Sequence, residues 1–252
     1  IPGIQKLGYT VSGADLKQGF KVWKEETSTS LSERDLSKYK SMYTFELPPD
    51  EGEIRESDRY FNTLANIINA TVASGQVLDR WRDIVNAMLE KIQGLPRITK
   101  LRVIHLFEAD MNLYLGIIWG RSMVHSVESV KGFGNENWGS RPGKRAIDVV
   151  LLKVMTYQLM EMTKTNGGTF DNDAKACYDH IIMALASLVC RRLGLPKEAV
   201  QFMANLLQTA RYRLKTRLGV SDEWYYNTVL APLFGSGQGS RASPALWLAI
   251  ST

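Results

Sequence analysis

Residues 165–179 read Thr-Asn-Gly-Gly-Thr-Phe-Asp-Asn-Asp-Ala-Lys-Ala-Cys-Tyr-Asp, and this stretch decides the fold. The Gly-Gly pair is typical of a turn, and residues 169–173 are expected to form a short strand. Residues 176–193 have the apolar spacing of an amphipathic helix, which Gly194 ends. The pattern therefore predicts a carboxylate, Asp173, between the end of a strand and a helix.

Downstream of this stretch the sequence predicts a helix and then a strand. Pro196 begins the helix, which runs to about residue 208, because proline suits the first helical position. Residues 211–217 alternate cations with less polar residues, and this period of two is typical of a strand. The strand is expected to be half of a hairpin that turns near Gly219. The cations on one of its faces are Arg211, Arg213, Lys215 and Arg217.

The last segment contains a glycine-rich loop, residues 235–240, followed by Ser243-Pro244 and an apolar helix. Upstream, residues 78–91 are ambiguous: their apolar spacing fits a helix, but residues 85–91 also fit a strand. The other predicted elements are two helical segments within 11–45, the second beginning at Ser32, a helix over 57–73, a strand over 101–106, and helices over 109–124 and 145–163.

The composition is that of a globular protein, with 252 residues of which 44% are hydrophobic and 23% are charged. No run of eighteen apolar residues occurs, so no membrane association is expected. A net charge of +5 is compatible with a polyanionic partner. Two cysteines cannot form a disulfide framework, and an intracellular, reducing location is expected. Three scattered histidines lack partners at metal-ligand spacing, which argues against zinc.

Four segments, taken in order, resemble the motifs of reverse transcriptases of the non-LTR retrotransposon type. Asp173, Tyr178 and Asp179 are similar to the first palm motif, an Asp at a strand end with an aromatic residue five positions later. Gly237-Gln238-Gly239-Ser240 with Ser243-Pro244 resembles the second. The other two matches are Lys91 with Arg102-Val103-Ile104, similar to the fingers motif, and Trp138-Gly139-Ser140-Arg141-Pro142-Gly143, similar to the element between fingers and palm.

The resemblance implies an α+β fold, a right-hand polymerase with helical fingers and a small antiparallel palm sheet. Residues 1–80 would be an N-terminal helical extension, 81–165 the fingers and 166–252 part of the palm. The implied activity is RNA-templated DNA synthesis from dNTPs, with an RNA template and a DNA or RNA primer as partners. No Tyr-x-Asp-Asp motif occurs. We therefore expect a piece of a longer protein that is inactive by itself.

The implied reaction needs two Mg²⁺ ions, for which Mn²⁺ is an alternative, to clamp the charge on the transferred phosphate. Mg²⁺ prefers hard oxygen ligands. Asp173 is therefore the expected catalytic residue and metal ligand, with the carbonyl of Ala174 as a second ligand. Asp171 offers the same chemistry, but its spacing to Tyr178 fits less well. Asp173 could instead serve only to cap the following helix.

The nucleotide would contact three parts of the chain. Tyr178 would lie under its sugar and exclude a ribose 2′-hydroxyl, although it could also be a core aromatic. Gln238 and Gly239 would lie beside it, because a glycine loop permits close backbone approach. The residues expected to pair with the triphosphate are Arg102 and Lys91, with Lys100 as an alternative to Lys91.

The cations of 211–217 would follow nucleic-acid phosphates, or else form a solvated strand face. Arg141 is either a template contact or a structural residue. Three alternatives stay open: a non-catalytic nucleic-acid-binding remnant of a degenerate retroelement, an RNA-templated RNA polymerase and a purely structural helical protein. Tyr178 argues against the RNA polymerase, because ribonucleotide selection favours a smaller residue there. The order of the motifs argues against the structural protein.

Overall fold

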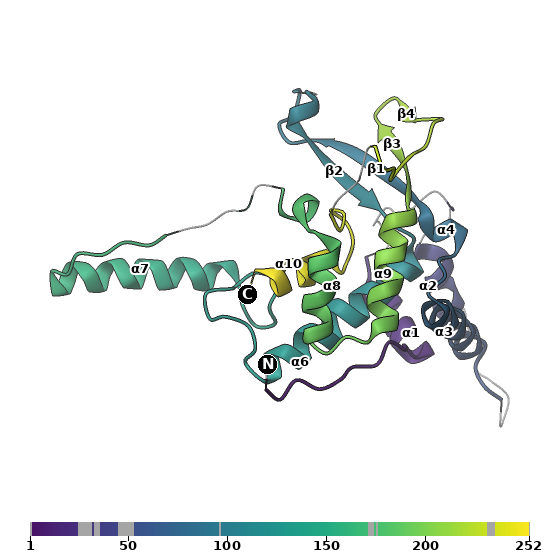
Figure 1. The fold of residues 1–252 in the computed structure, drawn as a ribbon, viewed down its shortest axis with the longest axis horizontal. Coiled ribbons are helices and arrows are strands. Elements are labelled where there is room, and N and C mark those ends of the chain that lie inside the picture. Colours follow the sequence, from purple (N-terminus) through teal and green to yellow (C-terminus); the bar gives the residue numbers. More distant parts are fainter. Residues whose placement is uncertain are drawn as a thin grey trace.

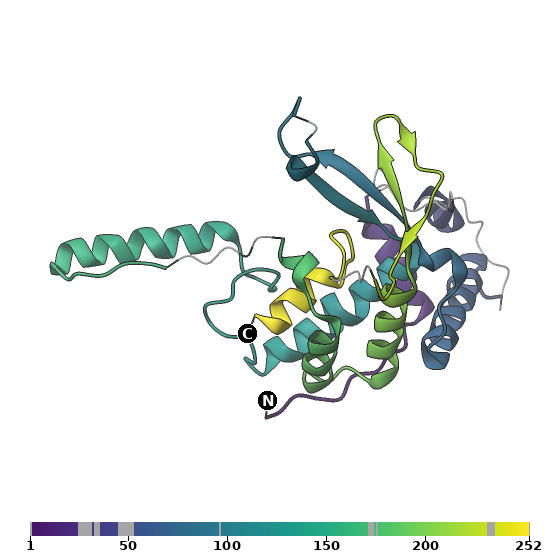
Figure 2. The ribbon, with the colours of Figure 1, turned by 45° about the horizontal axis from the view of Figure 1, so that its top comes forward.

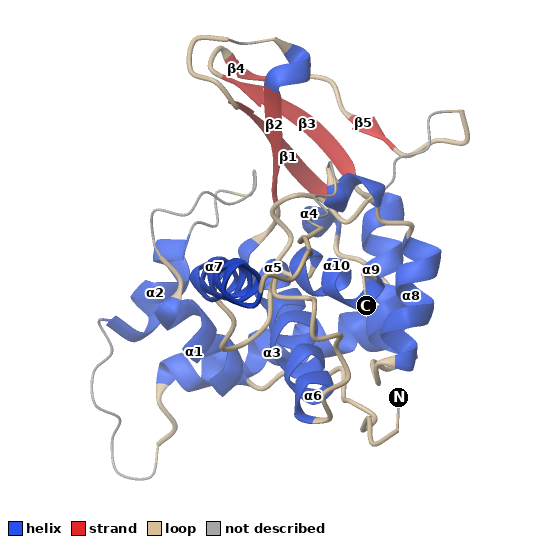
Figure 3. Ribbon diagram, turned by 90° about the vertical axis from the view of Figure 1, so that its left-hand side faces the viewer, coloured by secondary structure: helices blue, strands red, loops and turns tan. Residues whose placement is uncertain are grey.

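The computed structural model describes residues 2–24, 32, 36–44, 53–95, 97–170, 174, 176–230 and 235–251. Over these residues the protein is a mixed α/β structure, with one small sheet projecting from a body of helices (Figure 1, Figure 3). The expected α+β class is confirmed at this level. Within the described part, no helix is both long enough and apolar enough to cross a membrane.

Most of the predicted helices are found within a few residues of their expected bounds. The helices are α1 (Gly13–Val22), α2 (Leu36–Thr44), α3 (Glu56–Ser74), α4 (Asp79–Arg82), α5 (Ala109–Leu115), the π-helix η2 (Gly116–Met123), α6 (Val124–Ser129), α7 (Ala146–Thr163), α8 (Met183–Arg192), α9 (Lys197–Thr209) and α10 (Ser243–Ile250), with 3₁₀ turns η1 (Ile98–Lys100) and η3 (Cys177–His180). Pro196 is the residue before α9 and has extended backbone dihedrals.

Helix α1 begins at a capping box. The Ser12 hydroxyl accepts a hydrogen bond from the backbone N–H of Asp15, and the Asp15 carboxylate accepts one from the backbone N–H of Ser12, each at 3.1 Å. These bonds satisfy N–H groups that a helix start leaves free. Phe20 of α1 then stacks on Tyr39 of α2, with ring centroids 4.1 Å apart. The N-terminal helices therefore share the main core.

The sheet has the strand order β2-β1-β3-β4, with β5 paired to β3. The strands are β1 (Asp83–Glu90), β2 (Leu101–Leu106), β3 (Arg211–Thr216), β4 (Gly219–Val220) and β5 (Tyr225–Tyr226). β1 pairs antiparallel with β2 but parallel with β3. The expected antiparallel sheet is therefore wrong, because the sheet is mixed. The helices between β1 and β3 provide the long crossover that parallel pairing requires.

The ambiguous segment 78–91 contains one helical turn, α4, followed at once by strand β1. Ile84, Val85 and Asn86 are buried in succession. Burial of consecutive residues is expected of a strand that is covered on both faces. The strand prediction for residues 85–91 is therefore confirmed over most of its length.

Strand β1 is anchored to the helical body through a buried ionic network. Asp110 is fully buried and accepts hydrogen bonds from Arg80, at 3.0 Å, and from the indole N–H of Trp81, at 3.1 Å. Arg80 also donates to Glu108 at 3.1 Å. These bonds join α4 to the start of α5, and so fix the point at which the sheet leaves the body.

The structure departs from two predictions over residues 169–193. The predicted strand is absent at Thr169 and Phe170, which is 93% exposed, and its remaining residues, 171–173, lie outside the described residues. The predicted helix 176–193 is divided into η3 and α8. Ile181 separates them because it has extended backbone dihedrals, and its carbonyl accepts a hydrogen bond from Gly235 at 3.1 Å. That bond to a distant loop takes the place of a helical one.

Helix α7 extends away from the rest of the molecule (Figure 1, Figure 2). It has no buried residue, although much of its sequence is apolar. The predicted helix over 145–163 is confirmed, and its environment is solvent.

The predicted strand over 211–217 and its hairpin are confirmed, with β4 following at Gly219. β3 pairs with β1, so one sheet joins the segments that were expected to be fingers and palm. The division at residues 80 and 165 stays a prediction.

Candidate functional site

A pocket of about 540 Å³ lies between the β1–β2 hairpin, the turn η3 and the loop 235–240. Its lining combines residues from distant parts of the chain. The residues are Lys91, Leu101, Arg102, Val103, Ala174, Ala176, Cys177, Tyr178, Asp179 and Gln238. Five of the residues expected to bind nucleotide or metal therefore lie around one space.

Lys91 and Arg102 are placed by the register of the β1–β2 hairpin. Leu89 pairs with Arg102, and the backbone N–H of Lys91 donates to the carbonyl of Lys100 at 2.9 Å. Cross-strand partners share a face, so Lys91 and Arg102 project on the same side of the hairpin. Both are exposed, and neither forms an ion pair within the described residues. Lys100 is not among the residues that line the pocket.

Tyr178 lies on the opposite side of the pocket, in η3. Its ring is partly buried and packs against the main core, and this burial raises the pKa of its hydroxyl. The carbonyl of Tyr178 accepts a hydrogen bond from the backbone N–H of Ser236 at 3.0 Å. The ring is therefore both a pocket wall and a core contact, and its role toward a sugar stays a prediction.

The glycine loop lies against the edge of β2. The backbone N–H of His105 donates to the carbonyl of Gln238 at 2.7 Å. Gly239 has φ +134°, and a Cβ on it would lie 2.2 Å from the carbonyl oxygen of His105. A side chain at this position would collide with a strand backbone, so glycine is required here. This contact holds Gln238 at the mouth of the pocket.

Hydrogen bonds from polar side chains of the helical body also hold the same loop in place. The Ser243 hydroxyl donates to the carbonyl of Gly237 at 2.8 Å. The side-chain amide of Asn112 donates to the carbonyl of Gly239 at 3.0 Å, and its oxygen accepts from the backbone N–H of Arg241 at 2.7 Å. Sequence reasoning missed Asn112, because a single Asn within a helix carries no signal of a loop 127 residues away.

His105 is a second residue that sequence reasoning missed. Its ring stacks on Phe107, with centroids 6.2 Å apart, and meets the edge of Tyr212 at 5.6 Å. Burial lowers the pKa of His105, with a smaller opposing effect from the charge of Asp179. The neutral imidazole therefore belongs to the wall that supports the loop.

The expected metal ligand, Asp173, lies outside the described residues, as does its competitor Asp171. Ala174 lines the pocket, and Asp179 adds a carboxylate to it. Within the described ranges no group of three or more metal-ligating side chains occurs. The magnesium site therefore stays a prediction.

The cations of β3 lie on the same sheet face as Arg102. In the register, Val85 pairs with Arg213 and Ala87 with Lys215, while Leu89 pairs with Arg102. This face, which we call the basic face, consists of Arg102, Arg211, Arg213 and Lys215. Arg217 lies just beyond β3 in the hairpin turn.

Two cations of the basic face already have partners. Arg211 donates to the Asp83 carboxylate at 2.6 Å. The guanidinium carbon of Arg213 lies 4.3 Å from the ring centroid of Trp224, an aromatic residue that sequence reasoning missed. Lys215 and Arg217 are exposed, without an ion pair among the described residues. These two are therefore the cations most open to phosphate.

Arg141 is internal, which excludes it from a nucleic-acid surface. Its side chain is 6% exposed and forms a double hydrogen bond to the Glu128 carboxylate, at 2.9 and 3.1 Å. It also donates to the carbonyls of Gly134 and Asn137, at 2.6 and 2.8 Å. The prediction of nucleic-acid binding is wrong for this residue, because its donors hold the 128–141 loop together.

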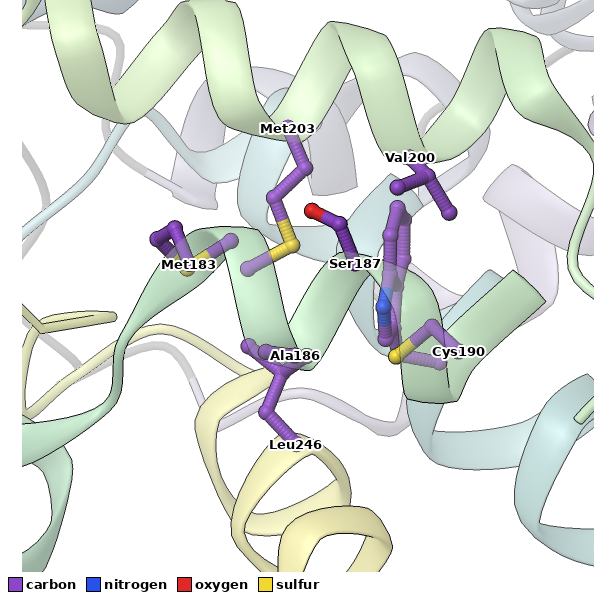
Figure 4. Close-up of a pocket in the computed structure, with 8 residues that line it drawn as sticks. Met183, Ala186, Ser187, Cys190, Val200, Met203 and Leu246 are labelled. Carbon is purple, nitrogen blue, oxygen red and sulfur yellow. The ribbon is translucent and has the colours of Figure 1, made fainter. Parts of the chain in front are cut away.

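A second pocket is part of the apolar core. Figure 4 shows Met203 and Val200 of α9 pointing toward α8, which contributes Met183 and Cys190, with Leu246 of α10 below them. The space leaves no room for a water molecule. Burial raises the pKa of the Cys190 thiol to about 12, so this thiol is protonated at neutral pH. Cys190 is therefore a packing residue of the core.

No protein-family model matches the sequence. No curated protein is significantly similar to it.

Proposed function

We propose that this chain is the fingers and the first part of the palm of an RNA-directed DNA polymerase of the non-LTR retrotransposon type. In the parent protein it would add dNTPs to a primer 3′-hydroxyl on an RNA template. The observation that carries the proposal is the pocket of about 540 Å³. Its walls combine residues from three of the four sequence segments that resemble polymerase motifs.

The cations and the aromatic ring of the pocket lie on different sides, which suits the triphosphate and the sugar of a nucleotide. Arg102 and Lys91 lie on the hairpin side. The planar guanidinium of Arg102 and the ammonium group of Lys91 both suit binding to triphosphate oxygens. Tyr178 stands on the other side, where a ring excludes a 2′-hydroxyl. Gln238 lies between them, with its main chain held by β2, and offers a donor and an acceptor to a base.

Asp173 would hold the metal ions, together with the Ala174 carbonyl. When bound, two Mg²⁺ ions stabilise the negative charge that gathers on the transferred phosphate. These 252 residues contain no adjacent pair of aspartates. A second set of carboxylates would therefore come from sequence outside them.

The basic face, continued by Arg217, supports binding of template or primer. Contacts between Lys or Arg and phosphates are independent of sequence and weaken as salt is raised. Lys215 and Arg217 are exposed and free for such contacts within the described residues. Arg213 stacked on Trp224 adds a flat surface beside them.

A first experiment tests the pocket with residues 1–252 and a fluorescent dNTP in Mg²⁺. Arg102→Ala removes a charge-assisted contact of about 1.5–3 kcal/mol, so affinity should fall about 10- to 150-fold. The matched control is Arg97→Ala, an exposed arginine of the same hairpin that does not line the pocket. Equal loss in both variants would reject the pocket as the nucleotide site.

The role of Tyr178 is tested with the same assay and a fluorescent rNTP. Wild-type protein should prefer the dNTP, and Tyr178→Ala should bring the two affinities close together. No preference in the wild type would contradict the sugar gate.

Activity is tested with a longer chain that contains a Tyr-x-Asp-Asp motif. Primer extension on RNA should require Mg²⁺ and should disappear in Asp173→Ala. A folded longer chain that binds primer–template but extends nothing would favour the non-catalytic remnant.

A further inference from the structure

The glycine loop is followed by a cation that has no part in the proposed nucleotide site. This residue is Arg241, two residues after Gly239. The backbone N–H of Arg241 is held by Asn112, the residue that also holds Gly239. The position of Arg241 is therefore coupled to that of the loop.

The Arg241 side chain rests on the π-helix η2 and on an indole. A Cβ added to Gly116 would lie 2.9 Å from the Nε atom of Arg241 and 3.1 Å from the Cβ of Arg241. The Arg241 side chain therefore fits here because residue 116 is glycine. The guanidinium carbon lies 4.6 Å from the ring centroid of Trp23. Trp23 is itself stacked on Phe20, with centroids 6.3 Å apart, and Phe20 is fully buried.

The charge of Arg241 has no partner among the described residues. Within those residues its guanidinium forms no ion pair and donates no hydrogen bond. Burial lowers the pKa of Arg241, and no acid of the described ranges opposes that effect. Arg241 is nevertheless exposed over part of its surface. An arginine kept in place on a fixed ring, with its donors unused, is suited to an anionic and flat ligand.

Single-stranded nucleic acid has both properties. Its bases stack on aromatic rings and on guanidinium planes, and its phosphates accept hydrogen bonds from arginine. In the proposed function a template base pairs with a nucleotide beside Gln238, and Arg241 follows Gln238 by three residues. The template would therefore pass near Arg241.

We infer that Arg241 and Trp23 form a clamp for the single-stranded RNA template next to the nucleotide pocket. The inference rests on the proposed function, to which it adds a binding site for the template. The clamp joins α1 to the loop 235–240, so the N-terminal helices would take part in holding the template.

The test measures binding of a labelled single-stranded RNA 12-mer to residues 1–252 by fluorescence anisotropy, over a range of salt concentrations. Arg241→Gln and Trp23→Ala should each weaken binding about 10-fold. Arg241→Gln should also reduce the salt dependence by the equivalent of about one phosphate contact. The matched control is Arg192→Gln, an exposed arginine in the last turn of α8, which should change neither quantity.

A second variant separates binding from folding. Gly116→Ala adds a methyl group where the Arg241 side chain lies, and alanine is favourable in a helix. The variant should displace Arg241 and weaken RNA binding at least fivefold while the thermal midpoint stays within a few degrees of wild type. Wild-type RNA affinity in both Gly116→Ala and Arg241→Gln would overturn the clamp.

The fluorescent dNTP distinguishes failure of the clamp from failure of the proposed function. If wild-type protein binds dNTP and RNA but the clamp variants bind RNA normally, only the clamp is rejected. If wild-type protein binds neither, both are rejected. Equal affinity of wild-type protein for duplex and single-stranded RNA would also overturn the clamp, because a paired base cannot stack on it.

Discussion

Replacing Asp110 by alanine should destabilise the protein strongly, because it breaks the buried network that joins α4 to α5. The Asp110 carboxylate accepts hydrogen bonds from Arg80, from the Trp81 indole and from the backbone N–H of Met111. Alanine removes the bonds to all three partners, including a second bond from Arg80 to the other carboxylate oxygen. It also leaves the Arg80 guanidinium with Glu108 as its remaining carboxylate in this network.

The expected cost follows from the burial of the pair. Removing one partner of a buried ion pair costs about 3–5 kcal/mol. The Arg80 side chain is 22% exposed and keeps Glu108, so the lower end of that range applies, about 3 kcal/mol. For a protein of this size such a loss lowers the thermal midpoint by about 6–12 °C.

Urea unfolding followed by tryptophan fluorescence and by circular dichroism measures this loss. The matched control is Asp79→Ala, which removes the 90%-exposed carboxylate that pairs with Arg82. The free energy of unfolding in that variant should stay within about 0.5 kcal/mol of wild type. An Asp110→Ala variant as stable as Asp79→Ala would refute the reasoning, because the buried network would then contribute nothing.

Two further predictions concern the wall of the pocket. The pKa of His105 is lowered in the folded protein. Below pH 6.5 His105 therefore binds a proton more readily in the unfolded chain than in the folded one, and the free energy of unfolding falls as the pH falls. His105→Phe should reduce the loss of unfolding free energy between pH 7.5 and 5.5 in urea titrations; an unchanged loss would contradict this. Gly239→Ala should cost about 2–3 kcal/mol through its clash with the His105 carbonyl. Gly139→Ala, with no atom within 4 Å of the added methyl, should stay within about 0.5 kcal/mol of wild type in the same assay.

Local features of the fold could be predicted from the sequence because they depend on neighbours along the chain. Helical spacing located α3 and α9, and the period-two cations located β3. Such patterns reflect which face of one element is buried. Where a distant contact intervened, local reasoning failed: the helix predicted over 176–193 is interrupted at Ile181, whose carbonyl bonds to Gly235.

The resemblance to polymerase motifs indicated Lys91, Arg102, Tyr178 and Gln238 as candidate site residues, and their roles stay predictions. Their shared pocket, and the buried position of Arg141 beside Glu128, depend on the tertiary structure alone.

The physical reason is the range over which each property is determined. Helix and strand periods are set within a few residues. The parallel pairing of β1 with β3, the close approach of Gly239 to His105 and the contact of Arg241 with Trp23 join residues more than a hundred positions apart. Which residues meet in these contacts depends on the packing of the whole core, and no local sequence pattern contains that information. The sequence by itself therefore determined the elements and the candidate chemistry, and the tertiary structure decided which of those residues meet.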